Sequence, residues 1–339
     1  MSKLSVVIPF VNENPLIQST IQSIAQELLD RCDFEILAVD NYCHQVEKQR
    51  EPTVEAVSVK HGISKEQVNA VLEEFDNPFV KDKGGEAVKA CQRGNPWLRY
   101  VVYSDRLSHW QAKNYAVSKA EGDVFFFSDA HCVPSRDSIF KMFEFYVGNR
   151  KELNGSIHLP VTYKLLESHR LIYKLVWNPE RGECAYSFTP FRTREAPYEV
   201  PCMSCCGVMI GKEELERIGG FPKELGIYGG GENFLNFTMS VVGMKKWIWP
   251  HGALFHHGDK RGYHYIYDDY VRNKIIASYI YGGDDWAALF TSHAKGRPEV
   301  LQNILNDVKV KCNDHRRLIE SRQVQSIQQW ASNWVNERR

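Results

Sequence analysis

Residues 112–131, AKNYAVSKAEGDVFFFSDAH, indicate the fold class of this chain. Small apolar residues at helical spacing predict a helix over 108–120, and Gly122 closes it. The run Val124–Phe127 is unbroken and apolar, which is typical of a strand covered on both faces. The strand then ends on Asp129 and His131. A helix followed at once by a buried strand predicts an α/β unit with polar groups at the strand's carboxyl end.

The same alternation occurs nearer the N-terminus. Leu4–Phe10 and Phe34–Val39 are short apolar runs, and apolar residues follow helical spacing between them. Asn14 and Pro15 are suited to the N-cap and the first position of that helix. A third apolar run covers 98–103. We therefore expect an α/β fold with a mostly parallel central sheet flanked by helices.

The rest of the chain is less regular. Residues 46–96 are expected to be an insertion or an elaborated connection, with a helix near 65–75 capped by Ser64. In the second half we expect strands at 154–163, 208–210 and 246–249, helices at 212–218 and from Glu232, and irregular chain at 170–200. Beyond 265 the sequence predicts helices. The expected organisation is a catalytic domain over 1–264, with a nucleotide-binding half at 1–130 and an acceptor half at 131–264, followed by a helical extension over 265–339.

Composition narrows the class of protein. The chain has 339 residues, 43% of them apolar, with 42 basic and 42 acidic residues. This balance does not favour a bulk polyanion as partner. There is no apolar run long enough to suggest a membrane span and no recognisable signal peptide, and nine cysteines at irregular spacing are typical of reduced thiols. We expect a cytoplasmic protein, from a bacterium or from the host cytosol of a virus.

Three carboxylates lie near the predicted strand ends, at Asp40, Asp105 and Asp129. Ligands of open α/β sheets bind outside the carboxyl ends of the strands, so these acids are expected to line one crevice. The alternative for each one alone is ordinary turn chemistry, in which Asp is common.

Asp129 and His131 are the clearest candidates for metal ligands. Residues i and i+2 of an extended segment face the same side, so both side chains reach one ion. A carboxylate suits Mg²⁺ or Mn²⁺, and the added imidazole favours Mn²⁺. The third ligand is expected to be His256 or His257, although an ordinary surface histidine is the simpler explanation for either alone.

Two other motifs each have a structural and a functional explanation. Glu232 follows Gly229–Gly231, a segment that lets backbone approach a ligand. A carboxylate at a helix start is also favourable by helix electrostatics alone. The cysteines at 202, 205 and 206 have CxxC spacing but no second pair. They therefore predict a packed, thiol-rich strand rather than a zinc site.

The order of these segments resembles a known family. SVVIPFVNEN, EILAVDN, AKNYAVSKAEGDVFFFSDAH and GGFP…GGGEN are followed by a strand and a histidine. This is similar to the family 2 glycosyltransferases, which have the GT-A nucleotide-sugar fold. It is most similar to the polypeptide N-acetylgalactosaminyltransferases, with their Asp-x-His metal motif, GGEN segment and later metal-binding histidine. The resemblance covers roughly 3–45 and 98–265.

The resemblance implies roles for individual residues. A nucleotide-sugar donor, most simply a UDP-sugar, is the implied co-substrate. Asp129, acting in catalysis, would bind Mn²⁺ (or Mg²⁺) with His131 and His256, and the ion would neutralise the departing diphosphate. Glu232 would lie by the transferring sugar or the acceptor hydroxyl as the other catalytic residue. Residues implied in binding the nucleotide are Pro9, Phe10, Asp40, Arg106, Lys113, Arg261 and Tyr263.

Some positions depart from the family pattern. Asp40 is followed by Asn41 where the family often has a second acid, and Gly229 stands where the family has tryptophan. These departures leave the sugar and the acceptor open: a glycan, a small molecule, a protein or a modified base in nucleic acid, the last not favoured. We expect a metal-dependent glycosyltransferase, with retention slightly favoured over inversion. The alternatives are a non-catalytic nucleotide-sugar or carbohydrate binding protein and a sugar nucleotidyltransferase.

Overall fold

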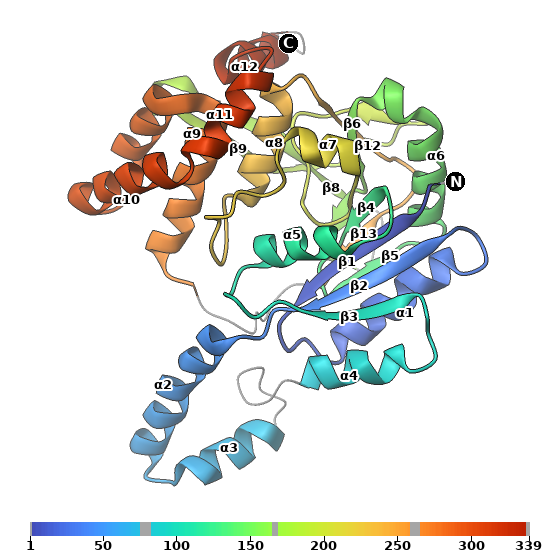
Figure 1. The fold of residues 1–339 in the computed structure, drawn as a ribbon, viewed down its shortest axis with the longest axis vertical. Coiled ribbons are helices and arrows are strands. Elements are labelled where there is room, and N and C mark those ends of the chain that lie inside the picture. The colour runs from blue at the N-terminus through green and yellow to red at the C-terminus, as the bar shows by residue number, and fades with distance from the viewer. Residues whose placement is uncertain (1, 75–82, 165–168, 258–264, 337–339) are drawn as a thin grey trace.

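The computed structural model describes residues 2–74, 83–164, 169–257 and 265–336. A large sheet forms its centre (Figure 1). The eight strands, in spatial order, are β10 (Tyr198–Glu199), β12 (Lys245–Ile248), β6 (Gly155–His158), β11 (Val208–Gly211), β4 (Val124–Phe127), β1 (Leu4–Phe10), β2 (Phe34–Asp40) and β3 (Leu98–Val102).

The first half of the sheet is parallel, as predicted. β1 pairs in parallel with both β2 and β4, and β2 pairs in parallel with β3. Every residue of β1, β2 and β4 is buried, which explains why their sequences are mostly apolar rather than alternating. β11 runs antiparallel between β4 and β6, so its first residues lie beside the carboxyl end of β4.

A second sheet packs over the carboxyl edge of the first. Its order is β5 (Cys132–Pro134), β13 (Leu254–His256), β7 (Val161–Thr162), β8 (Leu171–Asn178) and β9 (Glu183–Pro190). The prediction of irregular chain at 170–200 was therefore wrong, because β8 and β9 form a hairpin around the short 3₁₀ turn Pro179–Arg181. The single strand predicted at 154–163 is two strands, β6 and β7, one in each sheet.

Helices cover both faces of the large sheet. α1 (Leu16–Leu28), α4 (Lys83–Gln92) and α6 (Ser138–Leu153) pack around one apolar core. α5 (His109–Lys119) and α8 (Gly231–Val241) contribute to the core on the other side, and α7 (Lys212–Arg217) follows β11. Asn14 is not the N-cap of α1. The helix begins one residue later than predicted, with Pro15 in the capping position and no side-chain cap.

Among its described residues, the connection between β2 and β3 contains three helices. α2 (His44–His61) and α3 (Lys65–Glu74) form a hairpin that projects away from the sheet (Figure 1), whereas α4 returns to it. The Ser64 hydroxyl accepts a hydrogen bond from the backbone N–H of Gln67, and the Gln67 side chain accepts one from the Ser64 N–H. The predicted N-cap is therefore confirmed, as a capping box.

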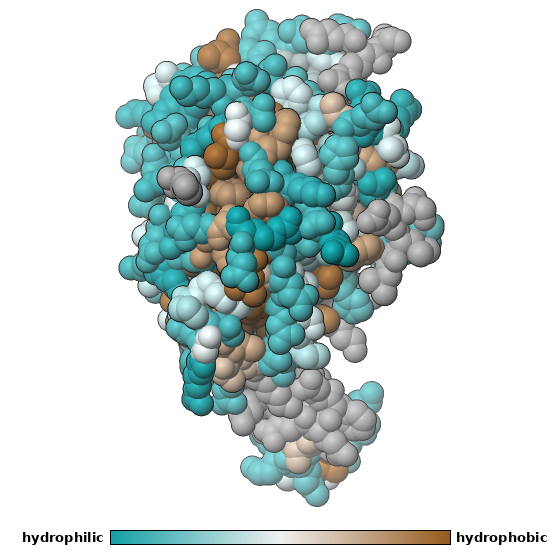
Figure 2. All heavy atoms as spheres, turned by 90° about the vertical axis from the view of Figure 1, so that its right-hand side faces the viewer, coloured by the Kyte–Doolittle hydropathy of each residue, from teal (hydrophilic) through white to brown (hydrophobic). Residues whose placement is uncertain are grey.

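The C-terminal region is helical, as predicted. It contains α9 (Tyr267–His293), α10 (Pro298–Lys311), α11 (Asn313–Arg322) and α12 (Ile327–Asn336). α9 packs on α8 and bends at Gly283, where φ is 83°. Figure 2 shows a largely hydrophilic face on which apolar side chains gather in a narrow vertical band. Within the described part of the chain, no helix combines the length and apolar character needed to cross a bilayer.

Candidate active site

A cavity of about 900 Å³ lies between the carboxyl ends of β1 and β4 and the second sheet. β1 contributes Pro9 and Phe10, and the start of α8 contributes Glu232. The opposite wall is aromatic and includes Tyr163, Tyr173, Tyr186, Phe188, Tyr228 and Tyr270. The cavity is large enough for a nucleotide-sized ligand and a second molecule, and its polar groups converge from several elements.

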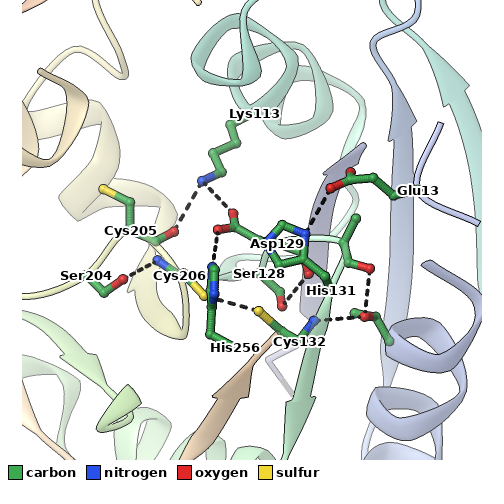
Figure 3. A network of polar contacts seen from close by, with 12 residues as sticks. Glu13, Lys113, Ser128, Asp129, His131, Cys132, Ser204, Cys205, Cys206 and His256 are labelled. Carbon is green, nitrogen blue, oxygen red and sulfur yellow. Dashed lines mark hydrogen bonds and ion pairs between the residues drawn. The ribbon is translucent and has the colours of Figure 1, made fainter. Parts of the chain in front are cut away.

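Asp129, His131 and His256 meet at this cavity. One ligand atom from each lies within 4.8 Å of the other two, and Figure 3 shows the three side chains facing one another. His256 Nε2 is 3.3 Å from Asp129 Oδ2, and the two imidazole rings are perpendicular. His257 is not a member of this group, although it also lines the cavity. Its backbone N–H donates to the His131 carbonyl oxygen at 2.9 Å.

After β4, residues 128 and 129 have no regular structure and residues 130 and 131 form a turn, whereas the sequence predicted extended chain. Thr20, on α1, holds this turn in place. Its hydroxyl donates to the Ala130 carbonyl oxygen at 2.9 Å and accepts from the Cys132 N–H at 3.0 Å. β5 then pairs antiparallel with β13 so that Cys132 lies opposite His256. The two sheets and α1 therefore fix the three side chains before any ligand binds.

Glu13 contacts the same group from the loop after β1. Its Oε1 lies 2.9 Å from His131 Nδ1, and its Oε2 accepts from the Val11 N–H at 3.2 Å. The bond to Nδ1 orients the ring so that Nε2 is the nitrogen that would meet a metal, as outer-shell carboxylates do in metal sites. Glu13 was not among the predicted site residues. The signal was available, because this residue follows a predicted buried strand at its carboxyl end.

The charges of the site favour an ionised carboxylate. Burial alone would raise the pKa of Asp129, but the hydrogen bond with His256 and the nearby Lys113 ammonium hold that pKa well below its usual range. Burial would likewise lower the pKa of His256, but the hydrogen bond to Asp129 raises it. Lys113 is 1% exposed, with Nζ 3.8 Å from Asp129 Oδ1 and 3.2 Å from the Cys205 carbonyl oxygen. A carboxylate and two imidazoles suit a divalent transition metal such as Mn²⁺.

Glu232 lies on the cavity wall at the first turn of α8. Burial raises the pKa of its carboxyl, partly offset by a hydrogen bond with its own backbone, by Lys113 and by the Tyr186 hydroxyl. Gly230, immediately before the helix, has φ of 71°, and a Cβ there would lie 2.4 Å from the backbone of Asn273. The glycines were predicted to let the backbone approach a ligand, whereas Gly230 lets the backbone of α9 pack closely against the start of α8. The contact with Tyr186 was not predicted.

Two of the three strand-end acids do not line this cavity. Asp105 is exposed. Asp40 is buried, and its carboxylate accepts from the Tyr42 N–H at 2.9 Å and from the Tyr100 hydroxyl at 2.5 Å. The expectation of three acids in one crevice was therefore wrong. The role of Asp40 toward a nucleobase stays a prediction.

Of the other residues expected to bind a nucleotide, only some lie at the cavity. Pro9, Phe10 and Lys113 line it. The Arg106 guanidinium instead donates to the carbonyl oxygens of Lys223 and, at 2.7 Å, of Leu225. Arg261 and Tyr263 lie outside the described residues.

The cysteines of the CxxC stretch do not form a strand, because β11 begins only at Val208. Cys202, Cys205 and Cys206 are buried, and only Cys202 pairs with a strand among the described residues, in an isolated bridge to Tyr173. The expected burial is therefore present without the expected strand. Cys206 lies beside Cys132.

Comparison with known proteins identifies the kind of domain. Residues 76–219 match the model of Glycosyl transferase family 2. The structure of GalNAc-T7 with UDP, GalNAc and Mn²⁺ superimposes with a TM-score of 0.61 at 17% identity, covering 91% of this chain and 55% of that one. This chain therefore spans about half the length of that protein. No curated protein matches the chain.

Two further solved structures align less closely. The mannosyltransferase PcManGT from Pyrobaculum calidifontis, in complex with GDP-Man and Mn²⁺, has a TM-score of 0.48 at 15% identity, with coverage of 95% of this chain and 74% of that one. S. aureus TarS 1-349, in complex with UDP-GlcNAc, has a TM-score of 0.47 at 12% identity, with coverage of 92% and 73%. Residues 76–219 are therefore similar to a family 2 glycosyltransferase domain, and the likeness to the GalNAc-T7 structure shows a GT-A-like fold.

Proposed function

We propose that this protein is a glycosyltransferase that moves a sugar from a UDP-sugar to an acceptor hydroxyl, with a divalent ion, most simply Mn²⁺, held by Asp129, His131 and His256. The observation that carries the proposal is the convergence of these three side chains at the wall of the 900 Å³ cavity. The GalNAc-T7 structure contains UDP and Mn²⁺, which supports the same donor and metal here. When bound, the ion supplies positive charge to the diphosphate as it leaves.

The protein's own groups then have distinct tasks. Pro9 and Phe10 form the apolar wall on the β1 side of the cavity, where a nucleobase would bind. The Lys113 ammonium, buried beside Asp129, adds fixed positive charge where negative charge develops on the donor. Glu13 keeps the His131 ring oriented.

Glu232 is the carboxylate placed to act on the sugar or the acceptor. Its raised pKa, caused mainly by burial, suits a group that exchanges a proton with the acceptor hydroxyl. The GGEN resemblance favours a retaining reaction, in which Glu232 orients the reacting groups. NMR of the anomeric proton of the product distinguishes retention from inversion, and an inverted product would contradict retention.

Asp129→Ala tests the assignment. UDP release from a panel of UDP-sugars should require Mn²⁺, stop in EDTA, and fall by at least about 100-fold in the variant, because the developing charge loses its stabilisation. Asp105→Ala is the matched control, since it removes an exposed strand-end carboxylate outside the cavity. Mn²⁺-dependent release at the wild-type rate from the Asp129 variant would refute the metal assignment.

A further inference from the structure

Two thiols lie directly behind the Asp129 group. Cys132 Sγ and Cys206 Sγ are 3.3 Å apart, and both side chains are buried. Together with His256 they form a second group whose ligand atoms all lie within 4.8 Å of one another. Figure 3 shows Cys132 and Cys206 on the side of His256 away from Lys113. His256 therefore belongs to two possible donor sets, one with oxygen and nitrogen atoms and one with sulfur.

His256 has an unused ligand atom. Its Nε2 faces the Asp129 carboxylate, whereas its Nδ1 is buried and has no hydrogen-bond partner among the described residues. A metal that binds at Nδ1 takes the imidazole in its neutral form, with the remaining ring proton on Nε2 donated to the Asp129 carboxylate, so any proton on Nδ1 is displaced on binding. A buried polar atom without a partner in a folded protein needs an explanation, and a role in binding an ion is one of the ordinary ones.

The backbone builds this group independently of any ion. Cys132 and His256 face each other across the β5–β13 pair. Cys206 comes from the segment before β11, where its N–H donates to the Ser204 hydroxyl at 3.0 Å. The next residue, Gly207, donates its N–H to the Phe127 carbonyl oxygen at the end of β4. Three separate elements therefore hold the donors in place, as a preformed metal site requires.

We propose that Cys132, Cys206 and His256 form a second metal site, for Zn²⁺ or Cd²⁺, which competes with the Asp129 site for His256. Two sulfurs and one nitrogen are the donors that Zn²⁺ prefers, with the fourth position open toward the cavity that Cys206 and His256 line. Mn²⁺ prefers oxygen donors and binds N/S sites more weakly than Zn²⁺. Binding replaces both thiol protons, which are released to solvent, and no electron is transferred.

The sulfur site is tested with Co²⁺, because a Co²⁺–thiolate bond gives a charge-transfer absorption that carboxylate and imidazole ligands do not give. Full-length protein, reduced and freed of reductant, is titrated with Co²⁺ alone. We expect the absorption in the wild type, and a loss of more than about 100-fold in affinity in Cys132→Ser and Cys206→Ser, since even outer-shell changes cost about 10–100-fold. Cys205→Ser is the matched control, because this neighbouring buried thiol is not in the group.

The outcomes separate this inference from the proposed function, because the absorption does not depend on sugar transfer. Asp129→Asn should keep the absorption while losing Mn²⁺ binding. In a second measurement, the Cd²⁺ concentration that displaces half of the bound Mn²⁺ from the wild type should rise at least tenfold in Cys206→Ser. The inference is overturned if the wild type gives no charge-transfer absorption, if the absorption survives in both serine variants, or if the two thiols remain a disulfide after reduction. Cys206→Ala replaces the serine variant if the latter does not fold.

Discussion

Replacing Glu13 should weaken Mn²⁺ binding although this residue is not expected to touch the ion. Its carboxylate lies 2.9 Å from His131 Nδ1, and the two side chains are only 15% and 19% exposed. Glu13→Ala removes the charge and the hydrogen bond and also frees the Val11 N–H. Glu13→Gln keeps a hydrogen-bonding group of the same length and removes only the charge. The two variants therefore separate orientation of the ring from its polarisation.

The expected loss of Mn²⁺ affinity can be worked out in two independent ways. Loss of an outer-shell partner costs about 10–100-fold in metal affinity, which is about 1.4–2.7 kcal/mol. A hydrogen bond to a charged group contributes about 1.5–3 kcal/mol when its partner is removed. The ranges agree, so we expect about 100-fold weaker Mn²⁺ binding in Glu13→Ala and about tenfold in Glu13→Gln.

The assay is a titration of free Mn²⁺ by electron paramagnetic resonance, without a donor sugar. Turnover measured at saturating Mn²⁺ should recover most of the wild-type kcat in Glu13→Gln, because the defect lies in holding the ion. Glu121→Gln, an exposed carboxylate remote from the cavity, is the control. If Glu13→Ala binds Mn²⁺ within twofold of the wild type, the orienting role is wrong.

Two further changes test other parts of the site. Glu232→Gln should abolish transfer and raise the melting temperature at pH 7. The pKa of Glu232 in the folded protein is raised above its ordinary value of 4.5, so the wild type loses stability as pH rises past 4.5. The increase in melting temperature from wild type to Glu232→Gln should therefore be larger at pH 7 than at pH 4. A larger increase at pH 4 would contradict the raised pKa. Gly230→Ala should cost at least about 2 kcal/mol in unfolding free energy by denaturant titration, because its Cβ would meet the Asn273 backbone at 2.4 Å in a left-handed conformation. Gly94→Ala, with open space around its Cβ, should change stability by no more than about 0.5 kcal/mol.

The regular half of the fold was predictable because burial on both faces leaves a direct mark on the sequence. β1, β2 and β4 were found within one residue of their bounds. The β8–β9 hairpin was missed because its residues are mostly half-buried, β8 shows no alternation of apolar and polar positions, and the alternation in β9 is limited to 186–189. The turn Pro179–Glu180–Arg181–Gly182, with Gly182 at φ of 61°, was the available signal.

Site residues were predictable where one local motif holds two of them, as with Asp129 and His131. A position at a strand end did not distinguish acids that face the cavity from acids that hydrogen-bond to neighbouring groups outside it. Asp40 bonds to Tyr100, sixty residues away, and only the register of β2 with β3 brings them together. The contact between Cys132 and Cys206 depends likewise on how β5, β13 and β11 meet, which no spacing in the sequence encodes.

The crossover from β2 to β3 has a consequence for protein engineering. These strands are neighbours in the sheet, and among the described helices of the crossover α4 packs against both of them, whereas α2 and α3 pack against each other. A crossover needs about a dozen residues, and the segment 41–97 is longer than that by roughly two doublings of chain length. The added length costs about 1.3 kcal/mol in the free energy of loop closure. Val46, buried with Val11 and Leu107, marks where the addition joins the body. We therefore expect that a tag, a reporter domain or a shortened connection can replace the α2–α3 hairpin while the large sheet keeps its geometry.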